Sequence, residues 1–161
     1  MNVFHIITVG RLREDYFRAA AAEYEKRLSA YGRVTKTEIS PKSLSDNPSA
    51  GEIASALDAE GAMILRALPK GAFVTAMCVE GRQFPSSEAL AERLGSELDA
   101  GASELAFIIG SSYGLSESVK ARADLKLSLS NLTFPHTMMQ PILYEVLYRS
   151  MSLLHGGRYH K

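Results

Sequence analysis

Residues 105–114 read Leu-Ala-Phe-Ile-Ile-Gly-Ser-Ser-Tyr-Gly, an apolar run that stops at a polar turn bounded by two glycines. The run Leu105–Ile109 is typical of a central strand buried on both faces, as in parallel sheets covered by helices. In open sheets of this kind, ligands bind beyond the carboxyl ends of the strands, where Gly110–Gly114 lies. This stretch therefore predicts an α/β fold and a candidate binding turn.

Outward from this strand, short β-rich runs alternate with longer segments of helical periodicity, which indicates a mostly parallel sheet. Pro141 is tolerated only in a first helical turn, so we expect the last helix to begin near Met138. No linker or repeat divides the chain, and we expect one domain over residues 1–161. The expected strands are 3–9, 33–39, 73–79, 105–109 and 125–129, and the expected helices are 13–31, 49–68, 87–100, 116–123 and 137–154.

Composition excludes several classes of protein. Of 161 residues, 46% are hydrophobic, which supports a folded core rather than disorder. The one cysteine, Cys78, excludes an internal disulfide and a cysteine-based zinc site, and fits a reducing compartment. No apolar run approaches the roughly 20 residues that cross a bilayer. We therefore expect a cytoplasmic protein with no membrane partner.

Charge is balanced overall but unevenly distributed. The 18 basic and 18 acidic residues give no net charge, which argues against bulk electrostatic binding of nucleic acid, DNA included. Basic residues outnumber acidic ones in 1–42 and 108–161, whereas acidic residues predominate in 43–107. The two ends can form a positive face if they meet in space, or the surface can be an ordinary mixed one, and the pattern leaves both open.

The remaining local motifs are weak on their own. Gly110–Gly114 lacks the third glycine of a dinucleotide fingerprint and the Gly-Lys-Ser/Thr of a P-loop. Its glycines can allow close approach of a cofactor, but taken alone a conformational role is the better explanation. The four histidines lack metal-site spacing, so we expect no metal. Glu145 and Arg149 are spaced for an ordinary exposed ion pair. The tail Arg158–Lys161 suits base stacking and phosphate contact, but a solvated chain end explains it more simply.

Taken together, the motifs of the last third form a specific combination. They are Phe107–Gly110, Tyr113-Gly114-Leu115, Leu127–His136, Leu147-Tyr148-Arg149 and Tyr159-His160-Lys161, accompanied by Ile7–Gly10 and Met77–Arg82. In this combination, and in length, the chain resembles the 23S rRNA pseudouridine-N3 methyltransferases of the SPOUT superfamily.

The resemblance implies a single-domain SPOUT methyltransferase fold with a deep trefoil knot at about 105–161. It also implies a homodimer that uses S-adenosylmethionine to methylate N3 of a pseudouridine of 23S rRNA in the assembled 70S ribosome. The cofactor-binding residues that it implies are Met77, Gly110, Leu129, Ser130, Asn131, Leu132, Thr133 and Phe134.

The reaction suggests roles for the tail. N3 of pseudouridine is a weak acid that must lose its proton, and His160 is the candidate that titrates near neutrality. We assign Tyr159 and Arg149 to the catalytic site with it, because they can stack on the base and stabilise negative charge. Arg158, Lys161 and His136 are candidate RNA contacts.

Two other functions stay open. Gln140 stands where the family commonly has arginine, Ser111 where it has a second glycine, and Pro141 is also unusual. The chain can therefore be a SPOUT methyltransferase acting on another rRNA or tRNA nucleotide, or a catalytically impaired ribosome-binding protein.

Overall fold

Five parallel strands form one sheet in the computed structural model, which describes residues 1–158. The strand order is β2-β1-β4-β3-β5, so the predicted mostly parallel sheet is confirmed. The strands are β1 (Asn2–Val9), β2 (Gly32–Ile39), β3 (Phe73–Arg82), β4 (Glu104–Ile109) and β5 (Leu125–Leu127).

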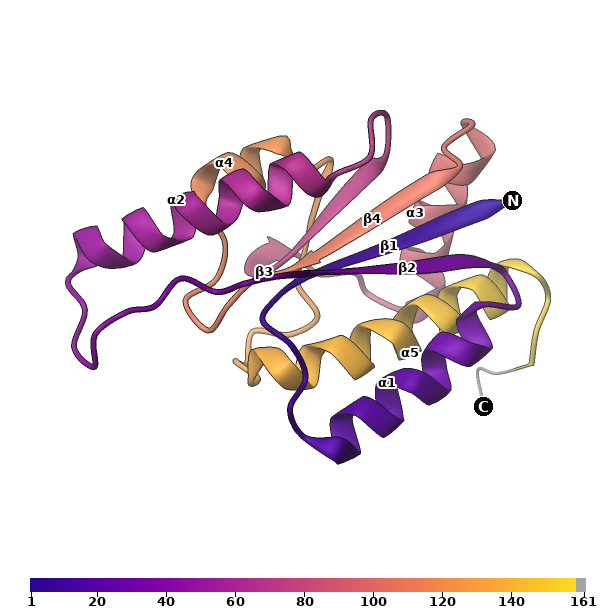
Figure 1. The fold of residues 1–161 in the computed structure, drawn as a ribbon. Coiled ribbons are helices and arrows are strands. Elements are labelled where there is room, and N and C mark those ends of the chain that lie inside the picture. The colour runs from indigo at the N-terminus through magenta and orange to yellow at the C-terminus, as the bar shows by residue number, and fades with distance from the viewer. Residues whose placement is uncertain (159–161) are drawn as a thin grey trace.

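Helices cover both faces of the sheet (Figure 1). On one face, α1 and α3 pack against α5, and on the other α2 packs against α4. Connections that cross between parallel strands need such helices, which explains the strict alternation seen in the sequence. The helices are α1 (Asp15–Leu28), α2 (Ala50–Ala67), α3 (Ser87–Asp99), α4 (Glu117–Arg122) and α5 (His136–Leu154).

The central strand β4 has the buried character that its sequence predicts. Leu105–Ile108 are fully buried, and their side chains alternate between the two faces. Leu105 and Phe107 belong to the core beneath α1, α3 and α5, whereas Ala106 and Ile108 belong to the core beneath α2 and α4. Burial on both faces is why the run contains no polar residue.

Two boundaries differ from the sequence expectation. Helix α5 begins at His136 rather than near Met138, so Pro141 is its sixth residue and lies inside the helix. The proline cannot donate the hydrogen bond that the Thr137 carbonyl would accept, but its side chain is buried in the packed interior. Packing of α5 against α1 and α3 therefore outweighs the local cost.

Strand β5 ends at Leu127, two residues earlier than expected. The Ser128 N–H donates to the Arg82 carbonyl (3.0 Å), and the Ser128 hydroxyl donates to the Ser130 carbonyl (3.0 Å). These bonds turn the chain out of the sheet. Within residues 1–158, no helix is long and apolar enough to cross a membrane.

Candidate cofactor pocket

A pocket of about 650 Å³ opens where β3, β4 and β5 end, as expected for an open parallel sheet. Its volume is in the range of small-molecule sites. Three segments of chain form most of its wall: Met77–Glu80, Ile109–Leu115 and, with the exception of Asn131, Leu127–His136; Lys120 and Met139 complete it.

The turn after β4 forms the first wall. The Gly114 N–H donates to the Ser111 carbonyl (2.9 Å), and Gly114 has a φ of +93°, which favours glycine. A Cβ atom on Gly110 would lie 2.3 Å from the Gly114 carbonyl oxygen. Gly110 is therefore required for closure of this turn, which is a conformational role of the kind that the sequence analysis favoured for it.

The segment between β5 and α5 forms the second wall, and side chains hold it in shape. The Ser130 hydroxyl accepts from the Leu132 N–H (3.0 Å), and the Gln83 amide donates to Asn131 Oδ1 (2.7 Å). These bonds leave two apolar side chains in solvent, since Leu132 is 70% exposed and Phe134 41%. Exposed apolar groups at a pocket offer surface for a flat apolar ligand.

A bulge at the end of β3 forms the third wall. The pairing of β3 with β5 shifts register between Met77 and Arg82, and this shift carries Cys78, Val79 and Glu80 into the pocket wall. At Gly81 the backbone passes so close to β5 that a Cβ would lie 2.7 Å from Lys126 backbone atoms. Glycine therefore permits the bulge.

One ion pair lies in the pocket wall. Lys120 Nζ of α4 is 2.5 Å from Glu80 Oε1, and Lys120 is only 20% exposed. The hydrogen bond between them lowers the pKa of Glu80 and raises the pKa of Lys120, so both stay charged at neutral pH. Burial, with the Glu80 carboxylate next, raises the pKa of the Cys78 thiol. Cys78 is therefore a poor nucleophile at neutral pH.

The structure gathers most of the predicted cofactor-binding residues around this pocket. Asn131 is the exception, because its side chain is hydrogen bonded to Gln83 and it lies outside the wall. His136, predicted as an RNA contact, lies in the same wall as the first residue of α5. The pocket residues among those predicted for the cofactor are Met77, Gly110, Leu129, Ser130, Leu132, Thr133 and Phe134.

Sequence reasoning missed Glu80 and Lys120. Glu80 belongs to Met77–Arg82, one of the stretches that carry the family resemblance. A single acidic residue in a strand, however, did not indicate which basic residue it would pair with. Lys120 follows Glu80 by 40 positions, and only the packing of α4 beside the end of β3 brings the two together. A charged residue next to the carboxyl end of a predicted strand was the one available signal.

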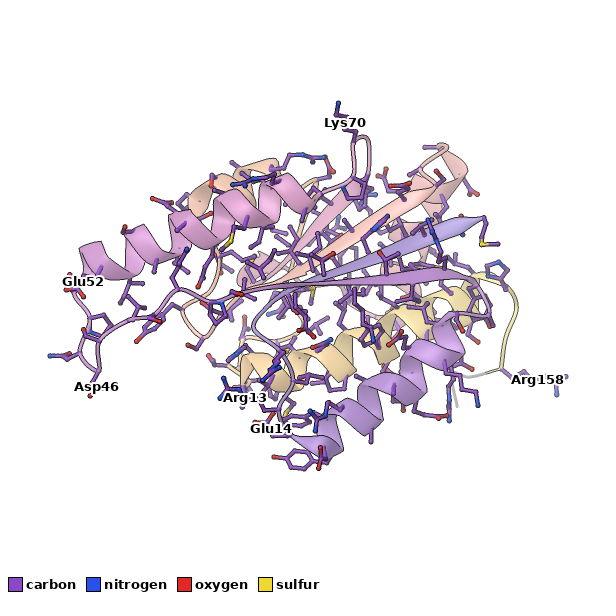
Figure 2. All side chains as sticks on the ribbon, viewed as in Figure 1. Arg13, Glu14, Asp46, Glu52, Lys70 and Arg158 are labelled. Carbon is purple, nitrogen blue, oxygen red and sulfur yellow. The ribbon has the colours of Figure 1, made fainter. Side chains whose placement is uncertain are left out.

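Of the catalytic residues predicted for the C-terminal part, Arg149 is the one within the described residues, and it does not line this pocket. Arg149 lies on α5 and bonds to Glu145, with Nε 2.9 Å from Oε1, and both side chains are about three-quarters buried rather than exposed as expected. Arg158 is exposed beyond the far end of α5 (Figure 2). Tyr159, His160 and Lys161 lie outside the described residues. Residues 1–158 contain no cluster of potential metal ligands.

Comparison with known sequences gives matches over nearly the whole chain. A family model described as "Predicted SPOUT methyltransferase" matches residues 1–160. The ribosomal RNA large subunit methyltransferase H of Pelotomaculum thermopropionicum is 42% identical over 160 residues, which cover 98% of this chain and 99% of that protein. The protein of the same name from Alkaliphilus oremlandii is 43% identical over 161 residues, with full coverage of both chains.

Solved structures share the fold at low sequence identity. A probable methyltransferase from Bordetella pertussis Tohama I has a TM-score of 0.57 at 15% identity, covering 93% of this chain and 96% of that one. A tRNA (m1G37) methyltransferase from Aquifex aeolicus has a TM-score of 0.55 at 16% identity, covering 99% and 74%. Together with the family match, these likenesses show that the chain belongs to the SPOUT methyltransferases, which use S-adenosylmethionine.

Proposed function

We propose that this protein methylates N3 of a pseudouridine of 23S rRNA in the assembled 70S ribosome, as a cytoplasmic homodimer. The observation that carries the proposal is full-length identity of about 40% to proteins named ribosomal RNA large subunit methyltransferase H. A chain without net charge fits an assembled particle better than free RNA, because it has few cations with which to displace counterions.

We place S-adenosylmethionine in the pocket described above. Its methionine end is charged and its adenine is flat and largely apolar, and the pocket contains both the Glu80–Lys120 pair and the exposed Leu132 and Phe134 side chains. When bound, this group supplies a methyl group on a sulfonium centre. In this proposal the Gly110 turn and the Ser130 segment, which both line the pocket, orient it largely through backbone groups, as the family resemblance implies.

The remaining chemistry belongs to the tail. The N3 nitrogen would form its bond to the methyl carbon as the carbon–sulfur bond breaks, its electron pair staying on sulfur to leave a neutral thioether, and in this proposal the N3 proton goes to the His160 imidazole. Tyr159 stacks on the base, while Arg149 stabilises the negative charge that develops on it. Arg158, Lys161 and His136 contact RNA.

In this proposal a dimer brings the tail and the pocket together. Helix α5 has 19 residues and spans about 28 Å. Its first residue, His136, lines the pocket, whereas Arg158 follows its last turn. We therefore propose that the tail of one protomer completes the pocket of the other. We further propose that residues 105–161 form the trefoil knot of a single domain, since the chain passes from β4 across β3 to β5 before returning as α5.

The test is methyl transfer from tritiated S-adenosylmethionine to 70S ribosomes that lack the modification, followed by mapping of the label. Ribosomes without the pseudouridine are the control substrate. Label at N3 of that pseudouridine alone supports the proposal. Label elsewhere, or on tRNA, identifies a different target, and cofactor binding without any label also contradicts the assignment. Absence of both label and cofactor binding favours the non-catalytic ribosome-binding function.

A further inference from the structure

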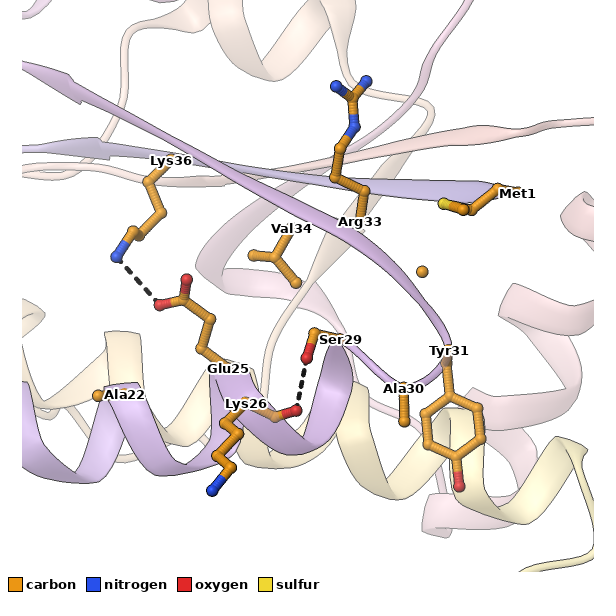
Figure 3. A pocket seen from close by; sticks show the side chains of 11 residues that line it. Met1, Ala22, Glu25, Lys26, Ser29, Ala30, Tyr31, Arg33, Val34 and Lys36 are labelled. Atoms are coloured by element: carbon orange, nitrogen blue, oxygen red, sulfur yellow. Dashed lines mark hydrogen bonds and ion pairs between the residues drawn. The ribbon is translucent and has the colours of Figure 1, made fainter.

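A second groove lies at the opposite end of the sheet from the cofactor pocket, between the last turns of α1 and the free edge of β2. Its volume is about 750 Å³. Strand β2 is the outermost strand, so among the described residues its outer edge has no strand partner. The groove walls are Met1, Ala22, Glu25, Lys26, Ser29–Val34 and Lys36 (Figure 3).

The groove is positively charged. Lys26, Arg33 and Lys36 line it, and the one acidic lining residue is Glu25. Lys36 Nζ lies 3.0 Å from Glu25 Oε2, so this carboxylate is already paired. Within residues 1–158, the exposed side chains of Lys26 and Arg33 make no ion pair or hydrogen bond. Figure 3 shows the two side chains extending away from each other, Lys26 from α1 and Arg33 from β2, so that they lie at the two rims of the groove. Two positive charges are therefore uncompensated here on a protein of no net charge.

The groove adjoins the end of α5. The Tyr31 ring, in the groove wall, lies 5.0 Å from the His155 ring and 6.1 Å from the Tyr148 ring. His155 immediately follows α5 and precedes the exposed Arg158 by three residues. The basic groove and Arg158, the first residue of the basic tail, thus lie at the same end of the molecule.

From this charge and position, we infer that the groove between α1 and β2 binds the phosphate backbone of the substrate RNA, with Lys26 and Arg33 as its principal contacts. The inference rests on the proposed function for the identity of the RNA. In the proposed dimer, the tail reaches the partner's pocket, so RNA whose target base enters that pocket continues onto the groove beside the tail. The groove then holds the flanking strand rather than the reacting nucleotide.

Phosphate fits this surface better than the alternatives. A phosphodiester carries one negative charge per nucleotide and matches spaced cations that lack partners, whereas a strand added to the edge of β2 would need no free cations. The groove is also open, with exposed residues on both walls, which suits an extended chain rather than an enclosed small molecule.

The test uses the full-length double variant K26Q/R33Q and the matched control R66Q/K70Q. Arg66 and Lys70 are also exposed cations, at the end of α2 and in the turn that follows it, and Lys70 projects from that turn in Figure 2. Binding to unmodified 70S ribosomes and to a 23S rRNA fragment is measured across a range of salt concentrations. Isothermal titration with S-adenosylmethionine and sedimentation velocity are run on all three proteins.

For K26Q/R33Q we expect RNA binding to be roughly tenfold weaker at low salt. We also expect the slope of log affinity against log salt concentration to be shallower by about 2 than the slope for the wild type. In the same variant, cofactor affinity and dimer mass should not change, and KM for ribosomes should rise while kcat stays the same. The control R66Q/K70Q should match the wild type in all of these measurements. Wild-type affinity and slope in K26Q/R33Q overturn the inference. Weaker binding with an unchanged salt slope also overturns it, because that result indicates a contact with ribosomal protein. Loss of the dimer overturns it too, because that result assigns the groove to the subunit interface.

Failure of the proposed function gives a different result. The wild type can fail to methylate 23S rRNA while its RNA affinity still depends on Lys26 and Arg33. That result would support the groove as an RNA-binding surface and would contradict the assignment of 23S rRNA as the target. If the wild type shows no salt-dependent RNA binding at all, the groove inference falls as well.

Discussion

Gly110 shows how much one position can constrain the pocket. The space that a side chain would occupy is filled by the Gly114 carbonyl, and backbone yields less readily than a flexible side chain. The sequence favoured a conformational role for the glycines of this turn. It could not reveal the contact behind that role, because the approach of Gly110 to Gly114 is a distance between backbone atoms that no residue pattern encodes.

Gly110→Ala should open the turn and weaken binding of S-adenosylmethionine by roughly tenfold or more, in line with a cost of about 1–3 kcal/mol for overpacking. Isothermal titration measures the affinity, and circular dichroism checks the fold. Gly51→Ala is the control, since Gly51 lies in α2 with only the Ser49 hydroxyl, at 4.0 Å, near the added methyl. Equal affinities in wild type and Gly110→Ala would show that the turn does not shape the site.

Cys78 should report on occupancy of the pocket. Its pKa is raised by burial and by the Glu80 carboxylate, so alkylation by iodoacetamide should be slow at pH 7 and accelerate as pH rises. Glu80→Gln removes a negative charge that disfavours the thiolate and should speed the reaction at pH 8. S-adenosylmethionine should protect the thiol in both proteins. Mass spectrometry follows the modified fraction, and an identical rate with and without cofactor would place the ligand elsewhere.

At the scale of elements, most of the architecture was predictable. All ten helices and strands of residues 1–158 lie where periodicity placed them, within a few residues. The exceptions are near the pocket, where β3 continues to Arg82 through a bulge and β5 is shorter than expected. Local pattern cannot fix such ends, since hydrogen bonds to a distant segment, as between Ser128 and Arg82, decide them.

Helix α4 connects fold stability to the pocket. The Ser116 hydroxyl accepts from the Val119 N–H (3.3 Å) and so caps the helix that carries Lys120. Ser116→Ala should lower the free energy of unfolding by about 1 kcal/mol and also weaken cofactor binding severalfold.

Ser49→Ala is the matched control for this change. Ser49 caps α2 in the same way, accepting from the Glu52 N–H (3.1 Å), and lies outside the pocket. Its loss should cost similar stability, measured by urea unfolding, with cofactor affinity unchanged. If both variants lost affinity equally, general destabilisation rather than the position of α4 would explain the effect.

The whole molecule separates its functional parts. The candidate cofactor pocket lies at the carboxyl ends of β3, β4 and β5, whereas Arg158 and the α1–β2 groove lie at the other end of the sheet. Strand β1 alone, with 8 residues, covers about 26 Å of this separation. Such a layout fits a site shared between two protomers.

Subunit complementation tests this sharing. At a cofactor concentration well below the wild-type Kd, we expect His160→Ala to be nearly inactive and Gly110→Ala to retain about a tenth of wild-type activity or less, each being impaired in one half of every shared site. Dimers reassembled from an equal mixture should recover about a quarter of wild-type methyl transfer, because half are mixed and each mixed dimer has one intact site. A mixture no more active than its components would show that each protomer works with its own tail.

The sequence by itself determined the parallel α/β sheet, its helical layers and the glycine-bounded turn after the central strand. These features follow from hydrophobic periodicity, glycine placement and capping residues, which act over a few neighbouring positions. Tertiary structure alone decided the bulge in β3, the Glu80–Lys120 pair, the position of Pro141 inside α5 and the basic groove beside β2. Each of these depends on segments distant in the chain that meet only when the core is packed, and their energies come from contacts that no local pattern contains.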